Sequence, residues 1–263
     1  MNPLIDLAPR CSCRPGSSRT GPGSKPRCRR SPRSPRSPPP RLVSRDPHRD
    51  QPVLVWGAPL AEAAGAMILM HGRGGSPGDM QALSRELDRP RFACLAPAAA
   101  GRTWYPYSFL ERIQRNEPHL SSALRLLKAA LVKAEAGGVP TARVVLLGFS
   151  QGACLALEFA ARNARRYGAV IGLSGGLIGP EGTPRDYAGS FDGTPVFLGS
   201  SDVDPHVPKR RVDETAAVFR RLGADVTERI YPGLGHAINA DEIAAARSLL
   251  DALLAGSARS PPP

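Results

Sequence analysis

Ser150 is the residue whose sequence surroundings point most clearly to chemistry. It lies in the segment Gly148-Phe-Ser-Gln-Gly152, which follows the apolar residues 144–147 and precedes a stretch, 153–163, with the composition of a helix. A Gly-x-Ser-x-Gly sequence between a strand and a helix is typical of a nucleophile elbow, a sharp turn that exposes the serine hydroxyl. The glycines leave room for the turn, and the helix N-terminus stabilises negative charge that develops in front of it. The sequence therefore predicts a nucleophile, rather than a surface serine between two turn glycines.

A serine hydroxyl is a weak nucleophile at neutral pH and needs a neighbouring base. His236 lies in the glycine-rich segment Tyr231-Pro-Gly-Leu-Gly-His-Ala-Ile238, between the last predicted strand and the last predicted helix. This position gives the chain order serine, acid, histidine that accompanies this type of elbow. We therefore predict His236 as the base, with His206 as the alternative. The other histidines are assigned to the N-terminal tail (His48), a glycine-rich turn (His71) and the solvent-facing start of a helix (His119).

Two carboxylates are candidates for the acid that orients the histidine. Asp202 and Asp204 lie in the segment Leu198-Gly-Ser-Ser-Asp-Val-Asp-Pro-His-Val-Pro208, directly after a predicted strand. A buried carboxylate there would hold the imidazole in the correct tautomer and stabilise its protonated form. Asp204 precedes Pro205, which favours an extended and fixed backbone. We predict Asp204 as the acid and Asp202 as a brace of the same loop.

Two backbone N–H groups are predicted to hold the oxyanion that forms when an acyl group is attacked. One belongs to Gln151, the residue after the nucleophile, and the second is expected from the loop after an early strand. The segment His71-Gly-Arg-Gly-Gly75 is such a loop, and its glycines allow the backbone to approach a substrate closely. We assign the second donor to the backbone N–H of Arg73. The same segment lacks the spacing of a phosphate-binding loop.

Four motifs together resemble the carboxylesterase/phospholipase family of the α/β-hydrolases, which contains the acyl-protein thioesterases. They are Leu69-Met-His-Gly-Arg-Gly-Gly75, Gly148-Phe-Ser-Gln-Gly-Ala153, Asp202-Val-Asp-Pro-His-Val-Pro208 and Gly235-His236. The resemblance spans about residues 53–254. It implies a serine hydrolase of carboxylic esters or thioesters that needs no cofactor. It also implies the catalytic triad Ser150, Asp204 and His236, with the Arg73 and Gln151 amides as oxyanion donors.

An aromatic segment is predicted to line the substrate pocket. Thr103-Trp-Tyr-Pro-Tyr-Ser-Phe109 contains Trp104, Tyr105, Tyr107 and Phe109, four of the fourteen aromatic residues of the chain. Apolar walls suit an acyl or aryl ester, although any one of these residues could instead cover the core. In this segment the chain departs from the thioesterases and looks like the smaller bacterial-type esterases. We therefore expect a carboxylesterase of small to medium acyl or aryl esters, with a thioesterase or a lysophospholipase as the alternative.

Strands and helices alternate along the rest of the chain, with short connections between them. This order predicts an α/β fold with a mostly parallel sheet covered by helices on both faces. In such sheets the ligand crevice lies at the carboxyl ends of the strands, where Ser150 falls. The predicted strands are 53–56 (at an edge), 66–70, 92–96, 144–147, 169–173, 196–198 and 225–230. The predicted helices are 77–87, one ending near Gly137 with Leu120, Leu124, Leu127 and Leu131 on one face, 153–163, 209–222 and 240–254.

The first fifty residues have a composition that a folded domain rarely shows. They hold twelve Lys or Arg, three Asp and eleven Pro, so they supply +9 of the net charge of +12. Such a stretch buries too little apolar surface to offset its ordering entropy. We predict a disordered basic tail at 1–50, the hydrolase domain at 51–256 and a disordered C-terminus at 257–263. The tail is read as a dispensable extension or an over-called start. Binding of nucleic acid or anionic surfaces, or a transit role, are the alternatives.

The remaining residues suggest no cofactor, metal or membrane anchor. No apolar run approaches the 18 residues of a spanning helix. The basic tail is not expected to be a secretory signal, because no apolar run of about 7–15 residues follows its charges. Cys94 and Cys154 fall in apolar settings, which indicates buried free thiols and a reducing compartment. We therefore predict a cytoplasmic enzyme whose partner is its small-molecule substrate. The sequence leaves a monomer and a homodimer open. It also leaves a second class open, a polyanion-binding protein that acts through residues 1–50.

Overall fold

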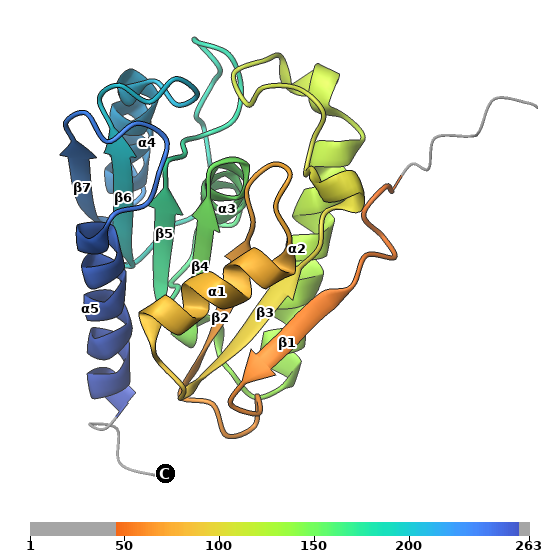
Figure 1. Cartoon of the computed structure of the whole chain (residues 1–263), viewed down its shortest axis with the longest axis vertical. Helices are drawn as coiled ribbons and strands as arrows, with labels where there is room; N and C mark the ends of the chain where they lie inside the picture. The colour runs from red at the N-terminus through yellow and green to blue at the C-terminus, as the bar shows by residue number, and fades with distance from the viewer. Residues whose placement is uncertain (1–45, 258–263) are drawn as a thin grey trace, which may run out of the picture. The chain divides into compact units, whose positions relative to one another are not determined.

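A seven-stranded sheet forms the centre of the protein, whose computed structural model describes residues 46–257 (Figure 1). The strand order is β1-β3-β2-β4-β5-β6-β7, and only β1 runs antiparallel to its neighbour. The strands are β1 (Val53–Gly57), β2 (Gly65–Met70), β3 (Phe92–Pro97), β4 (Val144–Phe149), β5 (Ala169–Leu173), β6 (Pro195–Ser201) and β7 (Asp225–Tyr231). The predicted edge position of the first strand is confirmed.

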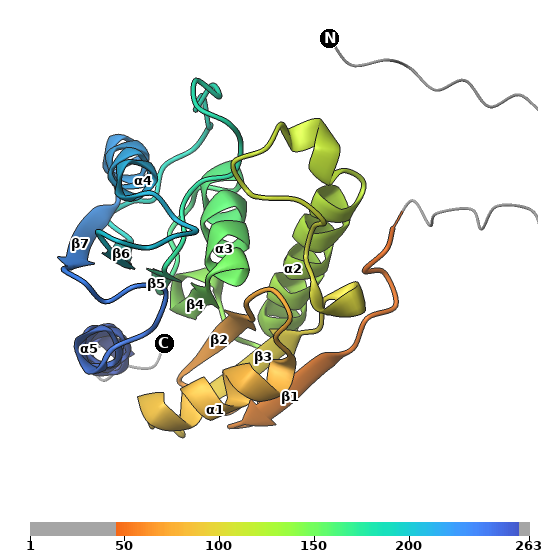
Figure 2. The same ribbon diagram turned by 45° about the horizontal axis from the view of Figure 1, so that its top comes forward.

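Within residues 46–257, five α-helices cover the two faces of this sheet (Figures 1 and 2). They are α1 (Pro77–Leu87), α2 (His119–Ala136), α3 (Gln151–Arg162), α4 (Lys209–Arg221) and α5 (Ala240–Ser257). Side chains of α1 and α5 pack on one face of the sheet, and those of α2, α3 and α4 pack on the other. The predicted α/β fold, with a mostly parallel sheet between two helical layers, is confirmed.

The burial of each strand follows from its place in the sheet. Every residue of β2, β3 and β5 is buried, because helices cover both sides of these strands. The edge strand β7 alternates between exposed and half-buried residues, and its sequence Asp-Val-Thr-Glu-Arg-Ile-Tyr alternates in the same way. The run of apolar residues before Ser150 is therefore long because β4 lies in the middle of the sheet.

The loops with the predicted catalytic residues follow the carboxyl ends of β2, β4, β6 and β7. These carboxyl ends all lie on the same side of the molecule, at the top of Figure 1. The N-terminus of α3 lies on that side too, because α3 begins at Gln151, directly after Ser150. The sequence predicted this helix to begin at residue 153. It begins two residues earlier because the turn itself is made by Ser150 alone.

The prediction of a disordered tail over residues 1–50 is wrong for residues 46–50, because these residues pack on the domain. His48 is fully buried, and its backbone N–H donates to Ser122 Oγ of α2 at 2.8 Å. Its ring also meets the ring of His119, at 6.1 Å between centroids. His119, predicted to face solvent, is half-buried as a result. The prediction rested on charge and proline content. It missed this contact because a single buried side chain leaves no periodic pattern in the sequence.

The ends of the chain bear on two further predictions. α5 continues to Ser257, and the rest of the predicted C-terminal segment lies outside the described residues, as does the tail up to residue 45. Over the part of the chain that the structure describes, none of the helices is long and apolar enough to cross a membrane. Within the same residues no group of three or more His, Cys, Asp or Glu side chains is arranged to hold a metal ion.

Candidate active site

Ser150 occupies a strained turn between β4 and α3. Its backbone has φ 56° and ψ −121°, a region that non-glycine residues rarely adopt. A Cβ on Gly148 would lie 2.3 Å from the Gly152 carbonyl oxygen, and one on Gly152 would lie 2.1 Å from that of Met70. Neither position tolerates a side chain, so the glycines of the motif are required by contact with the backbone. The Ser150 N–H donates to the Leu173 carbonyl of β5 at 2.9 Å, which fixes the turn to the sheet.

The structure brings Ser150, His236 and Asp204 into one chain of hydrogen bonds. His236 Nε2 lies 2.8 Å from Ser150 Oγ, and His236 Nδ1 lies 2.7 Å from Asp204 Oδ2. The Asp204 carboxylate can only accept, so Nδ1 carries the proton and Nε2 is left to accept the proton of the serine hydroxyl. The Asp204 side chain is fully buried, whereas the His236 side chain is 19% exposed. This is the arrangement of a nucleophile, a base and an orienting acid.

Asp204 and Asp202 occupy different places in the loop after β6. The second carboxylate oxygen of Asp204 accepts the backbone N–H groups of His206 and Val207, at 2.8 and 3.0 Å. Asp202 accepts the Gly233 N–H at 2.8 Å, whereas the hydrogen bond to the imidazole of His236 comes from Asp204. Asp202 therefore holds the loop after β7, which carries that histidine. The alternative base, His206, is exposed and meets the edge of the His236 ring at 4.9 Å between centroids.

Two free backbone N–H groups lie beside Ser150. A Cβ on Gly72 would lie 3.5 Å from the Ser150 Cβ, so the loop after β2 passes directly by the nucleophile. Among the hydrogen bonds of the described residues, neither the Arg73 N–H nor the Gln151 N–H has an acceptor. Gln151 is also the first residue of α3, whose N-terminus favours negative charge. Both predicted donors are thus available to a substrate oxygen.

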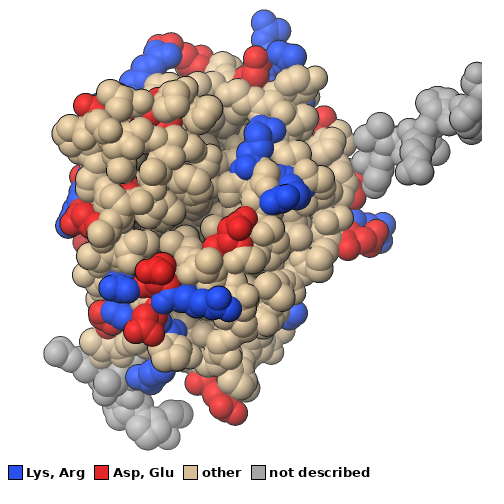
Figure 3. Space-filling view, viewed as in Figure 1, with Lys and Arg blue, Asp and Glu red and all other residues tan. Residues whose placement is uncertain are grey.

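A cavity of 540 Å³ opens beside Ser150 and His236. Three of the four predicted substrate residues, Tyr105, Tyr107 and Phe109, line it. Trp104 does not line it, because its ring is fully buried beneath the loop and its Nε1–H donates to the His71 carbonyl at 2.8 Å. The upper part of the face in Figure 3, over the carboxyl ends of β5 to β7, is formed mainly by uncharged residues. The aromatic side chains that line the cavity suit an apolar group beside Ser150.

The side chains of both oxyanion residues hold the aromatic wall of this cavity. Gln151 Oε1 accepts the Trp104 N–H at 2.9 Å, and Gln151 Nε2–H donates to the Tyr105 carbonyl at 2.8 Å. The Arg73 guanidinium donates to the carbonyls of Pro106 and Tyr107, at 3.0 and 2.8 Å. In each residue the backbone N–H is free while the side chain fixes the wall. The shape of the cavity and the position of the two predicted oxyanion donors are consequently coupled.

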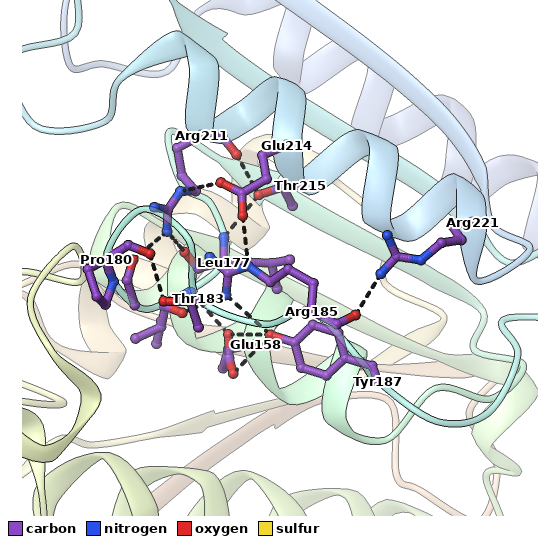
Figure 4. A network of polar contacts seen from close by, with 12 residues as sticks. Glu158, Leu177, Pro180, Thr183, Arg185, Tyr187, Arg211, Glu214, Thr215 and Arg221 are labelled. Carbon is purple, nitrogen blue, oxygen red and sulfur yellow. Dashed lines mark hydrogen bonds and ion pairs between the residues drawn. The ribbon is translucent and has the colours of Figure 1, made fainter.

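A buried polar network supports the far end of the same wall (Figure 4). The Phe109 carbonyl accepts the Gly179 N–H at 2.7 Å, and the Gly179 carbonyl accepts Arg211 Nη1–H at 2.6 Å. Arg211 and Arg185 both pair with Glu214, at 3.0 and 2.8 Å. These partners compensate the burial of the two guanidinium groups, which a low-dielectric interior would otherwise penalise. The network fixes the segment against which Phe109 rests.

Two buried side chains beside the site are kept uncharged by their surroundings. Burial raises the pKa of the Cys154 thiol to about 12, which excludes it as a nucleophile at neutral pH. Burial also lowers the pKa of His71, whose Nδ1–H donates to the Gly72 carbonyl at 2.7 Å. His71 therefore shapes the loop after β2, as its place in the sequence predicts. Cys154 contributes to the cavity surface instead.

The sequence did not single out Phe149 and Val207, which border the site, or His48, which hydrogen-bonds to the backbone of Ala100 and Trp104. Phe149 and Val207 line the cavity, and the Phe149 ring packs on His236 at 5.2 Å between centroids. Their positions next to the nucleophile and the acid were a usable signal, because such neighbours share the same crevice. His48 carried no such signal, since it lies a hundred residues before Ser150 and within a basic segment.

Similarity to known proteins defines the family to which the chain belongs. A sequence model of the phospholipase/carboxylesterase family matches residues 57–254. The chain belongs to this family, and the predicted resemblance is confirmed. Among solved structures, a phospholipase/carboxylesterase from Dyadobacter fermentans shares 41% identity, with a TM-score of 0.74 over 76% of this chain and 96% of that one. Esterase PE8 shares 27% identity, with a TM-score of 0.65 over 77% of this chain and 99% of that one.

Curated relatives match over a shorter stretch. Acyl-protein thioesterase 1 of Gibberella zeae is 34% identical over 109 residues, which are 40% of this chain and 46% of that protein. Acyl-protein thioesterase 1 of Debaryomyces hansenii is 31% identical over 117 residues, 44% of this chain and 50% of that protein. The match thus spans about half the length of these curated relatives.

Proposed function

We propose that this protein is a serine carboxylesterase that cleaves small to medium acyl or aryl esters through an acyl-enzyme. The observation that carries the proposal is the pair of short contacts at His236, 2.8 Å to Ser150 Oγ and 2.7 Å to Asp204 Oδ2. The strained turn, the two free amides and the adjacent cavity support it. Membership of the phospholipase/carboxylesterase family supports the same reaction class.

In this mechanism Ser150 Oγ attacks the ester carbonyl while His236 Nε2 takes the hydroxyl proton. The negative charge moves to the carbonyl oxygen, which accepts the N–H groups of Arg73 and Gln151. Asp204 stabilises the imidazolium that forms. The bond to the leaving alcohol then breaks as His236 returns the proton to its oxygen. A water molecule, deprotonated by His236, attacks the acyl-enzyme and releases the acid and free Ser150.

The substrate class follows from the cavity. Its walls present aromatic and aliphatic side chains. Among the described residues that line it, Arg73 is the one Lys or Arg, and its guanidinium already donates to the carbonyls of Pro106 and Tyr107. An uncharged acyl or aryl group is therefore favoured over a phosphorylated or acidic one. The cavity volume of 540 Å³ lies within the range of small-molecule sites.

Acyl-thioester cleavage is the second candidate, because the curated relatives are named acyl-protein thioesterases. The same nucleophile, base and oxyanion donors serve an ester and a thioester. The deciding experiment labels the full chain with a fluorophosphonate and then measures kcat/KM on p-nitrophenyl esters, acyl thioesters and lysophospholipids of matched chain length. Faster turnover of esters supports the carboxylesterase. Faster turnover of thioesters or lysolipids selects the alternative, and absence of both labelling and turnover rejects a serine hydrolase.

The other predicted properties stay proposals. Polyanion binding rests on a tail that, up to residue 45, lies outside the described residues. A cytoplasmic location is supported by the buried free thiols Cys94 and Cys154, which suit a reducing compartment. A small-molecule ester is the proposed partner of the site.

A further inference from the structure

His48, in the N-terminal segment, binds the backbone of the residues that lead into the aromatic wall of the cavity. Its side chain is fully buried, and both ring nitrogens bind backbone groups of the segment that leads into this wall. The Ala100 N–H donates to Nδ1 at 3.0 Å, and Nε2–H donates to the Trp104 carbonyl at 2.9 Å. These two partners require the neutral imidazole with its proton on Nε2.

The backbone around His48 is itself anchored, so the ring is held from behind. The Ser122 hydroxyl of α2 accepts the His48 N–H and donates to the Asp46 carboxylate. Asp46 also pairs with Arg125 Nε at 3.2 Å. Residues 46–48, called the strut below, are therefore fixed between α2 and Trp104 by hydrogen bonds at both ends.

Trp104 connects this strut to the reacting centre. Its N–H donates to Gln151, its indole N–H donates to the His71 carbonyl, and its own carbonyl accepts His48. The indole ring packs on His71 at 4.8 Å and on His48 at 5.8 Å between centroids. Tyr105, the next residue, lines the cavity. A displacement of Trp104 would thus also move Tyr105 and change the wall of the cavity.

We propose that His48 is a positioning residue for substrate selection: it holds Trp104, and through Trp104 it fixes Tyr105 and the aromatic wall. This inference rests on the proposed ester hydrolysis. It assigns a role to a residue outside the 57–254 segment that defines the family match. The N-terminal segment from Asp46 is consequently part of the substrate site, not an appendage to it.

The test compares three substitutions of His48 in the full chain. His48→Gln keeps a donor for the Trp104 carbonyl. His48→Asn, which is shorter, keeps an acceptor for Ala100 only, and His48→Phe keeps neither. We expect His48→Phe and His48→Asn to lower kcat/KM on p-nitrophenyl hexanoate relative to p-nitrophenyl acetate by about tenfold, because only the longer acyl group reaches the wall. His48→Gln should keep this ratio within about threefold. His119→Phe, which alters the neighbouring imidazole, is the control and should leave the ratio unchanged.

Hydrogen exchange provides a readout that does not depend on activity. The amides of residues 99–107 should exchange at least about tenfold faster in His48→Phe, since Ala100 loses its acceptor. An unchanged exchange rate together with an unchanged hexanoate-to-acetate ratio overturns the proposal, as does a His48→Gln variant that lowers this ratio as far as His48→Phe does. If the native chain hydrolyses no ester, the proposed function fails, and the exchange rates still decide whether His48 fixes the wall.

Discussion

The Ser150 hydroxyl would carry the acyl group, and the His236 imidazole would move its proton. Ser150→Ala should therefore abolish both ester turnover and fluorophosphonate labelling while the fold stays intact. His236→Ala should cost nearly as much, because such residues act as a unit, with a loss of about 10⁴–10⁶ in kcat. Steady-state rates and circular dichroism of both variants check this. Retention of more than about a tenth of the native activity in either variant would contradict the assignment.

The two loop aspartates give a matched pair for the assignment of the acid. Asp204→Asn should lower kcat by about 10⁴, because an amide facing Nδ1 favours the wrong imidazole tautomer. Asp202→Asn keeps an oxygen for the Gly233 N–H and leaves the hydrogen bond between Asp204 and His236 in place, so it should cost less than about tenfold. Measured kcat values for the two variants decide between them. A larger loss in Asp202→Asn would move the acid by two residues.

At the scale of elements, α5 begins with a buried carboxylate just after the loop that holds His236. Glu242 is fully buried and forms a reciprocal cap with Asn239: Glu242 Oε2 accepts the Asn239 N–H at 2.8 Å and Asn239 Oδ1 accepts the Glu242 N–H at 2.9 Å. Its other oxygen has no hydrogen-bond partner among the described residues and lies 2.2 Å from where a Cβ on Gly199 would be. Burial raises the pKa of Glu242 to about 7.

This raised pKa makes the contribution of Glu242 to stability depend on pH. A carboxyl whose folded pKa lies above its unfolded value stabilises most at low pH, and the contribution is lost as pH rises through about 7. Glu242→Gln keeps the cap but cannot ionise. It should match the native protein at pH 5 and exceed its free energy of unfolding by about 2–3 kcal/mol at pH 8. Urea denaturation at both pH values measures this, with the exposed Glu62→Gln as control. An equal difference at pH 5 and pH 8 would refute the explanation.

The elements also show where sequence reasoning succeeds. The strands and helices were predictable because their signals are contiguous: the apolar run before Ser150, the Ser76-Pro77 helix start, and the apolar face of α4. Ser150, Asp204 and His236 were predictable because each lies in a short motif at the end of a strand. The hydrogen bonds from the Arg73 and Gln151 side chains to the backbone of residues 104–107 were not predictable. They depend on how this segment folds against Arg73 and Gln151, which are distant from each other in sequence.

At the scale of the whole molecule, the N-terminal segment divides into two parts with different properties. Residues 1–45 hold eleven Lys or Arg and one Asp, whereas residues 46–50 are nearly neutral and include the buried His48. Composition over a window of fifty residues merges these parts, so it placed the domain boundary too late. Burial of one imidazole between α2 and Trp104 is a tertiary fact that no local average records.

Two truncated chains separate these parts. A chain beginning at Asp46 should keep kcat/KM within about twofold and lose most affinity for polyanions at low salt, because it lacks the basic residues of 1–45. A chain beginning at Gln51 has nearly the same net charge but also lacks His48 and Asp46. It should melt about 5–10 °C lower, because the Trp104 carbonyl and the Ala100 N–H lose buried partners. Melting temperature and hexanoate-to-acetate selectivity of both chains are the measurements. Equal behaviour of the two chains would show that the strut is dispensable, and equal losses in both would place an essential contact before residue 46.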